Sequence, residues 1–348
     1  MKSVVITAPG IVEVREAPFP EPGPGEALLK ILWGGICGSD LATYRGTSPY
    51  TPYPRVPGHE FSAEVVQTPE NSLGVAPGMV VTANPYFNCG RCYACHRGFV
   101  NCCQQNQTMG AQRDGAFSEY VTMPVERVID GQGVPADRLA MVEPFSISHH
   151  AVARAKVAAS DRVLVIGAGT IGVFAAVAAK LAGARVWVAD VSEAKLAGLG
   201  CFGIDGTILG GDAFNDGVAE IAGKDGFDVC IEAVGAPSTF QNAIDAAAHR
   251  GRVVQVGVGK STHDFFYTVL QTKELDVFGS RNALTSDFTE LIALLRDGKV
   301  DISPMVSATF GVDQAVAAFA SASANVATLR KTLVSFKPQR PENAQAPL

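Results

Sequence analysis

The stretch Val163–Gly183, VLVIGAGTIGVFAAVAAKLAG, has the pattern of a buried strand, a glycine turn and an Ala-rich helix. Gly167, Gly169 and Gly172 have the spacing G-x-G-x-x-G. In such a turn the first glycine permits a tight bend, the second lets the backbone approach a pyrophosphate, and the third lets helix and strand pack closely. The free N–H groups at the start of the helix attract phosphate oxygens. The stretch therefore predicts a dinucleotide-binding βαβ unit.

The strand that follows this helix ends at Asp190, 23 residues after Gly167. A carboxylate at this place accepts hydrogen bonds from both adenosine ribose hydroxyls and repels a 2′-phosphate, which favours NAD over NADP. Lys195 is a candidate for the adenosine end of the cofactor, and a solvated helix lysine is the alternative interpretation. Further candidate cofactor residues are Thr170, Ile171, Val234 and Val256.

The chain around this unit divides into two parts. From residue 162 to residue 280, apolar strand-like runs alternate with Ala-rich stretches of helical length, which predicts a parallel sheet covered by helices on both faces. The first 150 residues are instead rich in short β-type runs bounded by Pro and Gly. Ser286–Lys299 predicts an amphipathic helix with a Ser or Asp N-cap. A length of 348 residues agrees with about two domains.

The composition excludes several classes of protein. A net charge of −6 argues against a nucleic-acid-binding groove, which needs concentrated Lys and Arg. The N-terminal residues show no basic segment leading into an apolar one, and no apolar run is long enough for a bilayer. We therefore expect a cytoplasmic protein with no membrane partner. Thiols stay reduced in the cytoplasm, so closely spaced cysteines there are more often metal ligands than disulfide partners.

Five of the eight cysteines lie in the stretch Asn88–Gln104, NCGRCYACHRGFVNCCQ. Four of them have the spacing of a metal site: Cys89, Cys92, Cys95 and Cys103. Four thiolates complete the tetrahedral shell of zinc and leave no position for water or substrate, so the predicted site is structural. An iron–sulfur cluster is the alternative, because it uses similar ligands. Cys102 is interpreted as a bystander.

A second, sparse set of metal-ligand residue types is spread over more than a hundred positions: Cys37, His59, Glu60 and Glu143. Each alone has an ordinary explanation as a buried cysteine, a turn-capping histidine or a surface carboxylate. Together they offer one sulfur, one nitrogen and one or two oxygen ligands, which suits a catalytic zinc that keeps a position for a substrate oxygen. Spacing alone leaves open whether these side chains converge.

The chain resembles the zinc-dependent medium-chain dehydrogenases of the alcohol, sorbitol and threonine dehydrogenase superfamily over nearly its whole length. The motifs that carry the resemblance are EVREAPFPEPGPGEALLKILWGGICGSDL, YPRVPGHEFSAEVV, the cysteine stretch, DGAFSEYVTMP, EPFSISHHAV, the Gly167 turn and LRKTLVSF. The resemblance implies a mixed α/β fold in which a GroES-like β-rich catalytic domain (1–151 and 282–348) is interrupted by a Rossmann domain (152–281). It also implies a homodimer or homotetramer that pairs through the strand Leu275–Ser280.

The resemblance further implies residue roles. Cys37, His59 and Glu143 hold the catalytic zinc with water, Glu60 is an alternating or replacing ligand, and the four clustered cysteines hold a structural zinc. Zinc lowers the pKa of the substrate hydroxyl, NAD takes the hydride, and Ser39 relays the proton. Well-known alcohol dehydrogenases end this relay on a histidine where this chain has Ala42. Arg281 is expected to face the cofactor.

Three short motifs, EPFSISHHA, GAQRDGAFSEY and SRNA, resemble the branch that oxidises sugar acids such as L-gulonate or L-galactonate at C5. The candidate substrate residues are Arg113, Ser146 and His150, and the guanidinium of Arg113 fits a carboxylate. A neutral polyol such as sorbitol, galactitol or altritol is the alternative substrate class, and a threonine-type amino acid ranks third. A non-catalytic, zinc-containing NAD-binding regulator is the alternative from another functional class.

Overall fold

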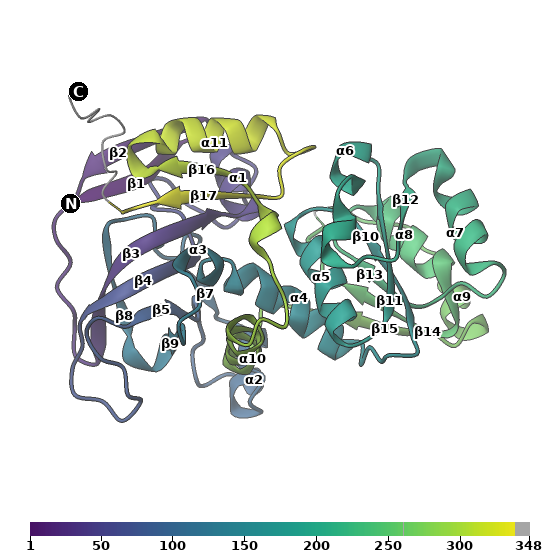
Figure 1. Ribbon diagram of the computed structural model, residues 1–348, viewed down its shortest axis with the longest axis horizontal. Coiled ribbons are helices and arrows are strands. Elements are labelled where there is room, and N and C mark those ends of the chain that lie inside the picture. The colour runs from purple at the N-terminus through teal and green to yellow at the C-terminus, as the bar shows by residue number, and fades with distance from the viewer. Residues whose placement is uncertain (260, 338–348) are drawn as a thin grey trace, which may run out of the picture.

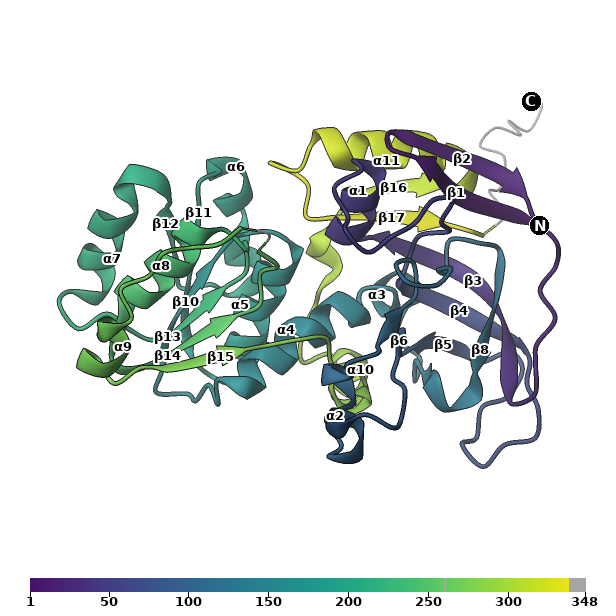
Figure 2. The same cartoon turned by 180° about the vertical axis from the view of Figure 1, so that it is seen from behind.

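The computed structural model describes residues 1–259 and 261–337 of the chain. Figures 1 and 2 show two lobes side by side, one built from both ends of the chain and the other from its middle. The part of the predicted second catalytic segment from 338 to 348 lies outside the described residues.

The first lobe contains a seven-stranded sheet with the order β16-β17-β3-β4-β5-β9, in which β8 pairs with β3. Its strands are β3 (Glu26–Ile36), β4 (Glu60–Gln67), β5 (Val80–Ala83), β8 (Tyr120–Pro124), β9 (Val128–Asp130), β16 (Val306–Gly311) and β17 (Lys331–Ser335). Because β17 pairs antiparallel with β3, the C-terminal segment completes the sheet begun by the N-terminal one.

The second lobe is a six-stranded parallel sheet with the order β12-β11-β10-β13-β14-β15. Its strands are β10 (Arg162–Ile166), β11 (Arg185–Asp190), β12 (Gly206–Leu209), β13 (Phe227–Glu232), β14 (Ala247–Gln255) and β15 (Asp276–Gly279). Alternate residues of β10 belong to different apolar cores, Val163 and Val165 to one and Leu164 and Ile166 to the other. Both faces are therefore covered, which confirms the predicted Rossmann architecture, and the order reverses between β10 and β13, where such folds bind ligands.

The sequence-based expectations differ from the structure at two helices. α4 (Val142–Arg154) continues across the expected domain boundary at 151/152. α10 (Thr285–Arg296) has Leu284 rather than Ser or Asp as its N-cap, and Asp287 is the third residue of the helix, where its Oδ2 accepts a hydrogen bond from the Leu284 N–H at 2.7 Å. Asp287 still caps this helix end, but from inside the first turn.

The remaining elements connect and cover the two sheets. The strands are β1 (Lys2–Ala8), β2 (Ile11–Glu16), β6 (Tyr86–Phe87) and β7 (Gln107–Thr108). The α-helices are α1 (Gly38–Tyr44), α2 (Tyr93–His96), α3 (Ala136–Leu139), α5 (Thr170–Leu181), α6 (Glu193–Leu196), α7 (Phe214–Ala222), α8 (Pro237–Ala246), α9 (Thr268–Thr272) and α11 (Ala315–Ala324). The 3₁₀ helices are η1 (Val100–Cys102), η2 (Val125–Arg127), η3 (Leu199–Phe202), η4 (Gly211–Ala213), η5 (Ser303–Met305) and η6 (Val312–Gln314). Among the described residues, no helix combines the length and apolarity needed to cross a membrane.

Candidate active site

The glycine turn between β10 and α5 has the local geometry that a dinucleotide requires. Gly167 has a φ of +108°, a backbone conformation that favours glycine. A Cβ on Gly172 would lie 1.7 Å from the Gly167 carbonyl oxygen, so no other residue fits there. A Cβ on Gly169 would meet nothing within 4 Å, which leaves its backbone open on the side where a pyrophosphate approaches. The turn therefore fits the predicted cofactor.

Asp190 lies at the carboxyl end of β11, beside this turn. Its Oδ2 accepts a hydrogen bond from the Ala168 N–H at 2.7 Å, and its Oδ1 accepts one from the Ser192 N–H at 2.9 Å. The carboxylate thus joins the glycine turn to the loop after β11. Each carboxylate oxygen has more than one acceptor position, so Asp190 keeps capacity for ribose hydroxyls.

The contacts of the other predicted cofactor residues are partly internal. The Thr170 hydroxyl donates to the Arg330 carbonyl oxygen, and the Ile171 carbonyl accepts from the Ser148 hydroxyl at 2.8 Å. A hydroxyl contact from Thr170 to the cofactor would have to replace its bond to Arg330. The Lys195 carbonyl accepts from Arg330 Nη2 at 3.3 Å.

Glu232 is a site residue that sequence reasoning missed. It ends β13, is fully buried, and its Oε1 accepts from the backbone N–H groups of Val234 and Gly235, both at 2.8 Å. Its backbone carbonyl accepts from the Val256 N–H at 2.9 Å. Glu232 therefore shapes the loops that carry Val234 and Val256 at the carboxyl edge of the sheet. An acidic residue directly after the apolar run from Val229 to Ile231 was the signal that could have revealed it.

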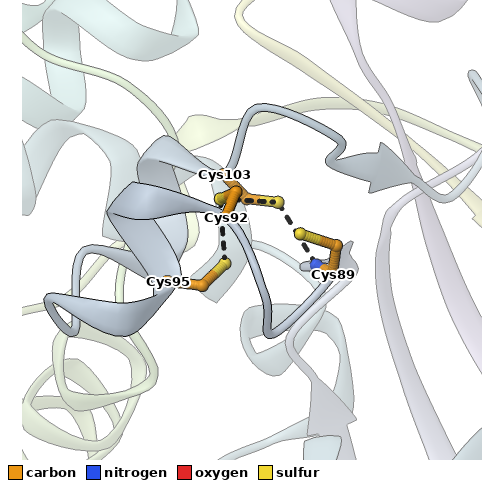
Figure 3. A group of neighbouring side chains, drawn as sticks. All are labelled: Cys89, Cys92, Cys95 and Cys103. Carbon is orange, nitrogen blue, oxygen red and sulfur yellow. Dashed lines mark hydrogen bonds between the residues drawn. The ribbon is translucent and has the colours of Figure 1, made fainter.

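The four predicted structural ligands converge. Figure 3 shows the thiols of Cys89, Cys92, Cys95 and Cys103 turned toward one another from α2 and the loops around it, and their sulfur atoms lie within 4.8 Å of each other. Backbone N–H groups of Cys95 and Gln104 lower the pKa of Cys92 to about 6, whereas burial raises the pKa of Cys103 to about 11. Cys102 is exposed and lies outside the cluster, as expected.

Three of the four residues of the sparse set converge as well. Cys37, His59 and Glu60 offer ligand atoms within 4.8 Å of one another, and Glu143 is not part of this compact set. Cys37 follows β3 as the N-cap of α1, and Glu60 begins β4 opposite Gly35 of β3. A Cβ on Gly35 would lie 2.2 Å from Glu60 Oε2, so this glycine makes room for the carboxylate. Glu60, expected as the alternating or replacing ligand, is thus the carboxylate that lies in the compact set, and the choice between Glu60 and Glu143 as ligand stays a proposal.

Asp40, which sequence reasoning also missed, ties the two ligand-bearing segments together. Its buried carboxylate accepts from the Cys37 N–H at 2.9 Å and from the Gly58 N–H at 3.1 Å. The Asp40 side chain thereby fixes the backbone of Cys37 and of Gly58, the residue before His59. The acid three positions after Cys37, at the start of a short helix, was the available signal.

Two further side chains hold the carboxylates of this site. Lys331 from β17 binds Glu60, with its Nζ 2.5 Å from Oε2. The Tyr86 hydroxyl donates to Glu143 Oε1. Three buried atoms of the site nevertheless have no hydrogen-bond partner among the described residues: His59 Nδ1, Glu60 Oε1 and Glu143 Oε2. Unpaired buried polar atoms are costly, so their gathering beside a thiol fits a bound metal ion.

The electrostatics of the site also favour a cation. Burial raises the pKa of Glu143 to about 7. Burial lowers the pKa of His59, but the negative charge of Cys37 and Glu143 raises it well above its usual value. Two carboxyl groups and a thiol thus surround His59 in a region of low dielectric, where a divalent cation is attracted, and the Lys331 ammonium at Glu60 offsets part of this attraction.

Three other predicted residues lie outside this arrangement or face away from it. Ser39 is exposed at the start of α1, and no hydrogen bond of its hydroxyl is found in the described part of the chain. Ser146 is fully buried and its hydroxyl donates to the Glu143 carbonyl at 2.7 Å. His150 accepts at Nε2 from Asn101 Nδ2 at 3.2 Å and donates from Nδ1 to Asp287 at 3.1 Å. A substrate contact from Ser146 or His150 would have to replace these hydrogen bonds, and the substrate roles expected of the two residues stay predictions.

The two predicted arginines have different surroundings. The Arg113 guanidinium carbon lies 3.6 Å from the centre of the Phe87 ring, and Arg127 stacks on the same ring at 4.5 Å. No hydrogen bond or ion pair of the Arg113 guanidinium is found within residues 1–259 and 261–337. The Arg281 carbonyl accepts from Asn101 Nδ2 at 3.0 Å, just after β15.

Three features define a zinc-containing, dinucleotide-dependent dehydrogenase. They are the glycine turn at the switch point of the parallel sheet, the closed cluster of four cysteines, and the open cluster of Cys37, His59 and Glu60. Residues 23–135 match the family model of the alcohol dehydrogenase GroES-like domain, and residues 170–297 match that of the zinc-binding dehydrogenases. The chain belongs to the zinc-dependent medium-chain dehydrogenase family. The zinc expected from the sequence agrees with the zinc-binding family model, and solved structures of relatives hold NADH or NADP.

Individual relatives cover nearly the whole chain. L-galactonate-5-dehydrogenase of Escherichia coli K12 is 36% identical, over 88% of this chain and 91% of its own length. Sorbitol dehydrogenase of Halalkalibacterium halodurans is 33% identical, over 90% and 94%. The crystal structure of an alcohol dehydrogenase (rspB) of Escherichia coli CFT073 with NADH superposes with a TM-score of 0.90 at 29% identity and covers 97% of this chain and 99% of that one.

Proposed function

We propose that the protein oxidises a secondary hydroxyl of a sugar acid, at C5 of an L-gulonate- or L-galactonate-type substrate, and transfers the hydride to NAD. The convergence of Cys37, His59 and Glu60 is the observation that carries the catalytic part of the proposal. The relative that acts on L-galactonate supports the choice of substrate class.

Each part of the site has a task in this reaction. When bound, zinc lowers the pKa of the substrate hydroxyl and NAD accepts the hydride. Cys37, His59 and Glu60 hold the metal, and Asp40 keeps their two segments in register. Ser39 accepts the substrate proton, and because its side chain is exposed the proton passes to solvent without the histidine that Ala42 replaces.

The carboxylate of the substrate is assigned to Arg113. Stacking on Phe87 fixes the plane of its guanidinium, and its N–H donors have no partner among the described residues. The loop that carries Arg113 rests on the segment before His59, since the Ala116 N–H donates to the Gly58 carbonyl at 2.9 Å. An oriented, unpaired guanidinium is a strong bidentate partner for a carboxylate.

A neutral polyol is the second candidate, favoured by one observation. Successive side chains of a strand point to opposite faces, so Phe87 leaves β6 on the side opposite to Tyr86, whose hydroxyl binds Glu143. Because Arg113 stacks on Phe87, its guanidinium lies on the side of β6 opposite to Tyr86. A polyol, like the substrate of the sorbitol dehydrogenase relative, needs no cation near the open cluster.

Initial rates of NADH formation with L-gulonate, L-galactonate and a panel of polyols separate the two candidates. We expect oxidation of the acids, and we expect Arg113→Ala to raise KM for them by about 10- to 100-fold, the value of one hydrogen bond to a charged group. KM for any neutral substrate should stay unchanged. Arg97→Ala, which removes an arginine stacked on Tyr93 in the cysteine stretch, is the matched control.

Oxidation of polyols without oxidation of either acid would refute the sugar-acid proposal. Equal effects of Arg113→Ala on acid and neutral substrates would remove the role given to Arg113 and leave the substrate class to the panel.

We further propose that two copies pair through β15. In the described part of the chain this edge strand pairs with β14 only, and Val277 in it is 41% exposed. Phe266 and Tyr267 on the approach to α9 are 79% and 75% exposed. Open strand edges with large apolar neighbours favour association. Val277→Lys should convert a dimer to a monomer in sedimentation velocity; an unchanged dimer would place the interface elsewhere.

A further inference from the structure

The open cluster contains more carboxylate than a single open zinc site needs, and the two carboxylates are held in similar ways. Glu60 has its Oε2 bound to Lys331 Nζ at 2.5 Å, and Glu143 has its Oε1 bound to the Tyr86 hydroxyl. The second oxygen of each is buried without a hydrogen-bond partner among the described residues. Only Glu60, however, belongs to the compact set with Cys37 and His59.

Tyr86 cannot follow Glu143 if that carboxylate moves. Its backbone N–H donates to Asn84 Oδ1 at 3.0 Å, and its carbonyl accepts from Arg127 Nη1 at 2.6 Å, so β6 is fixed on both sides. The Tyr86 side chain is buried, and its residue is only 5% exposed. The hydroxyl is therefore a stationary donor, placed by the fold of the first lobe.

Leaving this donor has a cost for Glu143. A buried hydroxyl and a buried carboxylate oxygen that part without new partners both lose their hydrogen bond and stay desolvated. Glu60 meets no such barrier, because its Lys331 contact and its place in the compact set coexist in one geometry. Lys331 also donates to the Ile36 carbonyl at 3.2 Å, which fixes it beside β3.

We propose that Tyr86 is a positioning residue that holds Glu143 outside the ligand set and so leaves the third protein position to Glu60. This inference rests on the proposed ligand assignment of Cys37, His59 and Glu60. The Tyr86 hydroxyl decides which of two neighbouring carboxylates completes the metal site.

The test removes only that hydroxyl. In Tyr86→Phe, Glu143 keeps its place in α4 but has no protein donor, and the metal becomes its best partner. We expect zinc to leave the open site about tenfold more slowly in the presence of a chelator, the reverse of the 10- to 100-fold weakening that follows when a residue supporting a ligand is lost. With Co²⁺ exchanged into this site, the visible bands should weaken and shift, because an added oxygen ligand changes the coordination geometry.

Two matched variants complete the experiment. Tyr53→Phe deletes a hydroxyl that donates to the Thr43 carbonyl in the same lobe, and it should leave the zinc release rate and the cobalt bands as in wild type. Adding Glu143→Gln to Tyr86→Phe should restore the wild-type bands, since a carboxamide is a poor metal ligand. Glu143→Gln alone should also show wild-type bands, because Glu143 is outside the ligand set.

The outcomes separate this inference from the proposed function. If Cys37→Ser leaves the cobalt bands of the open site unchanged, the ligand assignment itself is wrong. If Cys37→Ser abolishes the bands but Tyr86→Phe keeps the wild-type bands and release rate, or loses zinc faster, the role of Tyr86 is wrong and the ligand assignment stands. A change of the bands by Glu143→Gln alone would likewise contradict the role of Tyr86.

Discussion

Replacing Cys37 by Ser lowers kcat/KM by about 10³-fold or more while the protein stays folded and binds NADH with unchanged affinity. Lewis-acid stabilisation by a catalytic metal is worth several kcal/mol, and each 1.36 kcal/mol is tenfold in rate. The fold depends little on this thiol, because Cys37 lies after β3 and outside the apolar core of the first lobe. The NAD turn from Gly167 to Gly172 belongs to the other lobe.

Rates of NAD reduction, NADH fluorescence titration and circular dichroism measure these three properties. Cys201→Ser, which changes an exposed cysteine of η3, is the control and should behave as wild type. An unfolded Cys37→Ser protein would contradict the division between catalytic and structural sites, and so would a variant that keeps its activity.

Replacing Cys103 by Ser has the opposite result, a large loss of folded protein. Cys103 is fully buried at the centre of the cysteine cluster, and structural zinc contributes about 10–16 kcal/mol of apparent binding energy in zinc-finger peptides. The loss extends beyond the cluster. Asn101, two residues earlier, binds the Arg281 carbonyl and His150, so it ties the cysteine stretch to the crossover between the lobes.

Thermal unfolding and soluble yield of Cys103→Ser are compared with those of Cys102→Ser. The control changes the neighbouring, exposed cysteine that lies outside the cluster, and it should unfold like wild type. Equal melting temperatures for Cys103→Ser and wild type would show that the closed site does not stabilise the fold. Cys92→Ser should behave like Cys103→Ser, because it removes a ligand of the same site.

The features that were predictable from sequence are those whose physics is local. The geometry of the glycine turn and of the strand before it is determined within a few residues. Four thiols within fifteen positions are close enough in sequence to converge on one metal ion. Strands β10, β11 and β13 were predictable because both faces of the sheet are covered there, which makes most of their positions apolar. β12 was not predicted from the sequence, because it is short and half exposed.

For the open site, the sequence predicted which residues take part but not how their side chains are arranged. The positions of the site's two carboxylates follow long-range contacts: Glu60 binds Lys331, which is 271 residues away in sequence, and Glu143 binds Tyr86, which is 57 residues away. The internal contacts of Ser146 and His150 depend on the rotation of α4: the Ser146 hydroxyl donates to the Glu143 carbonyl within the helix, and His150 accepts from Asn101. No pattern in a single sequence reports such long-range contacts.

Metal analysis of purified wild-type and Cys37→Ser protein tests whether the open cluster of Cys37, His59 and Glu60 holds the catalytic zinc. We expect two zinc ions per chain in wild type, one in each cluster, and one in Cys37→Ser. We also expect a chelator to remove one zinc from wild type, with complete loss of NAD reduction and retention of the fold. Two zinc ions in Cys37→Ser, or NAD reduction that survives removal of the labile zinc, would contradict this assignment.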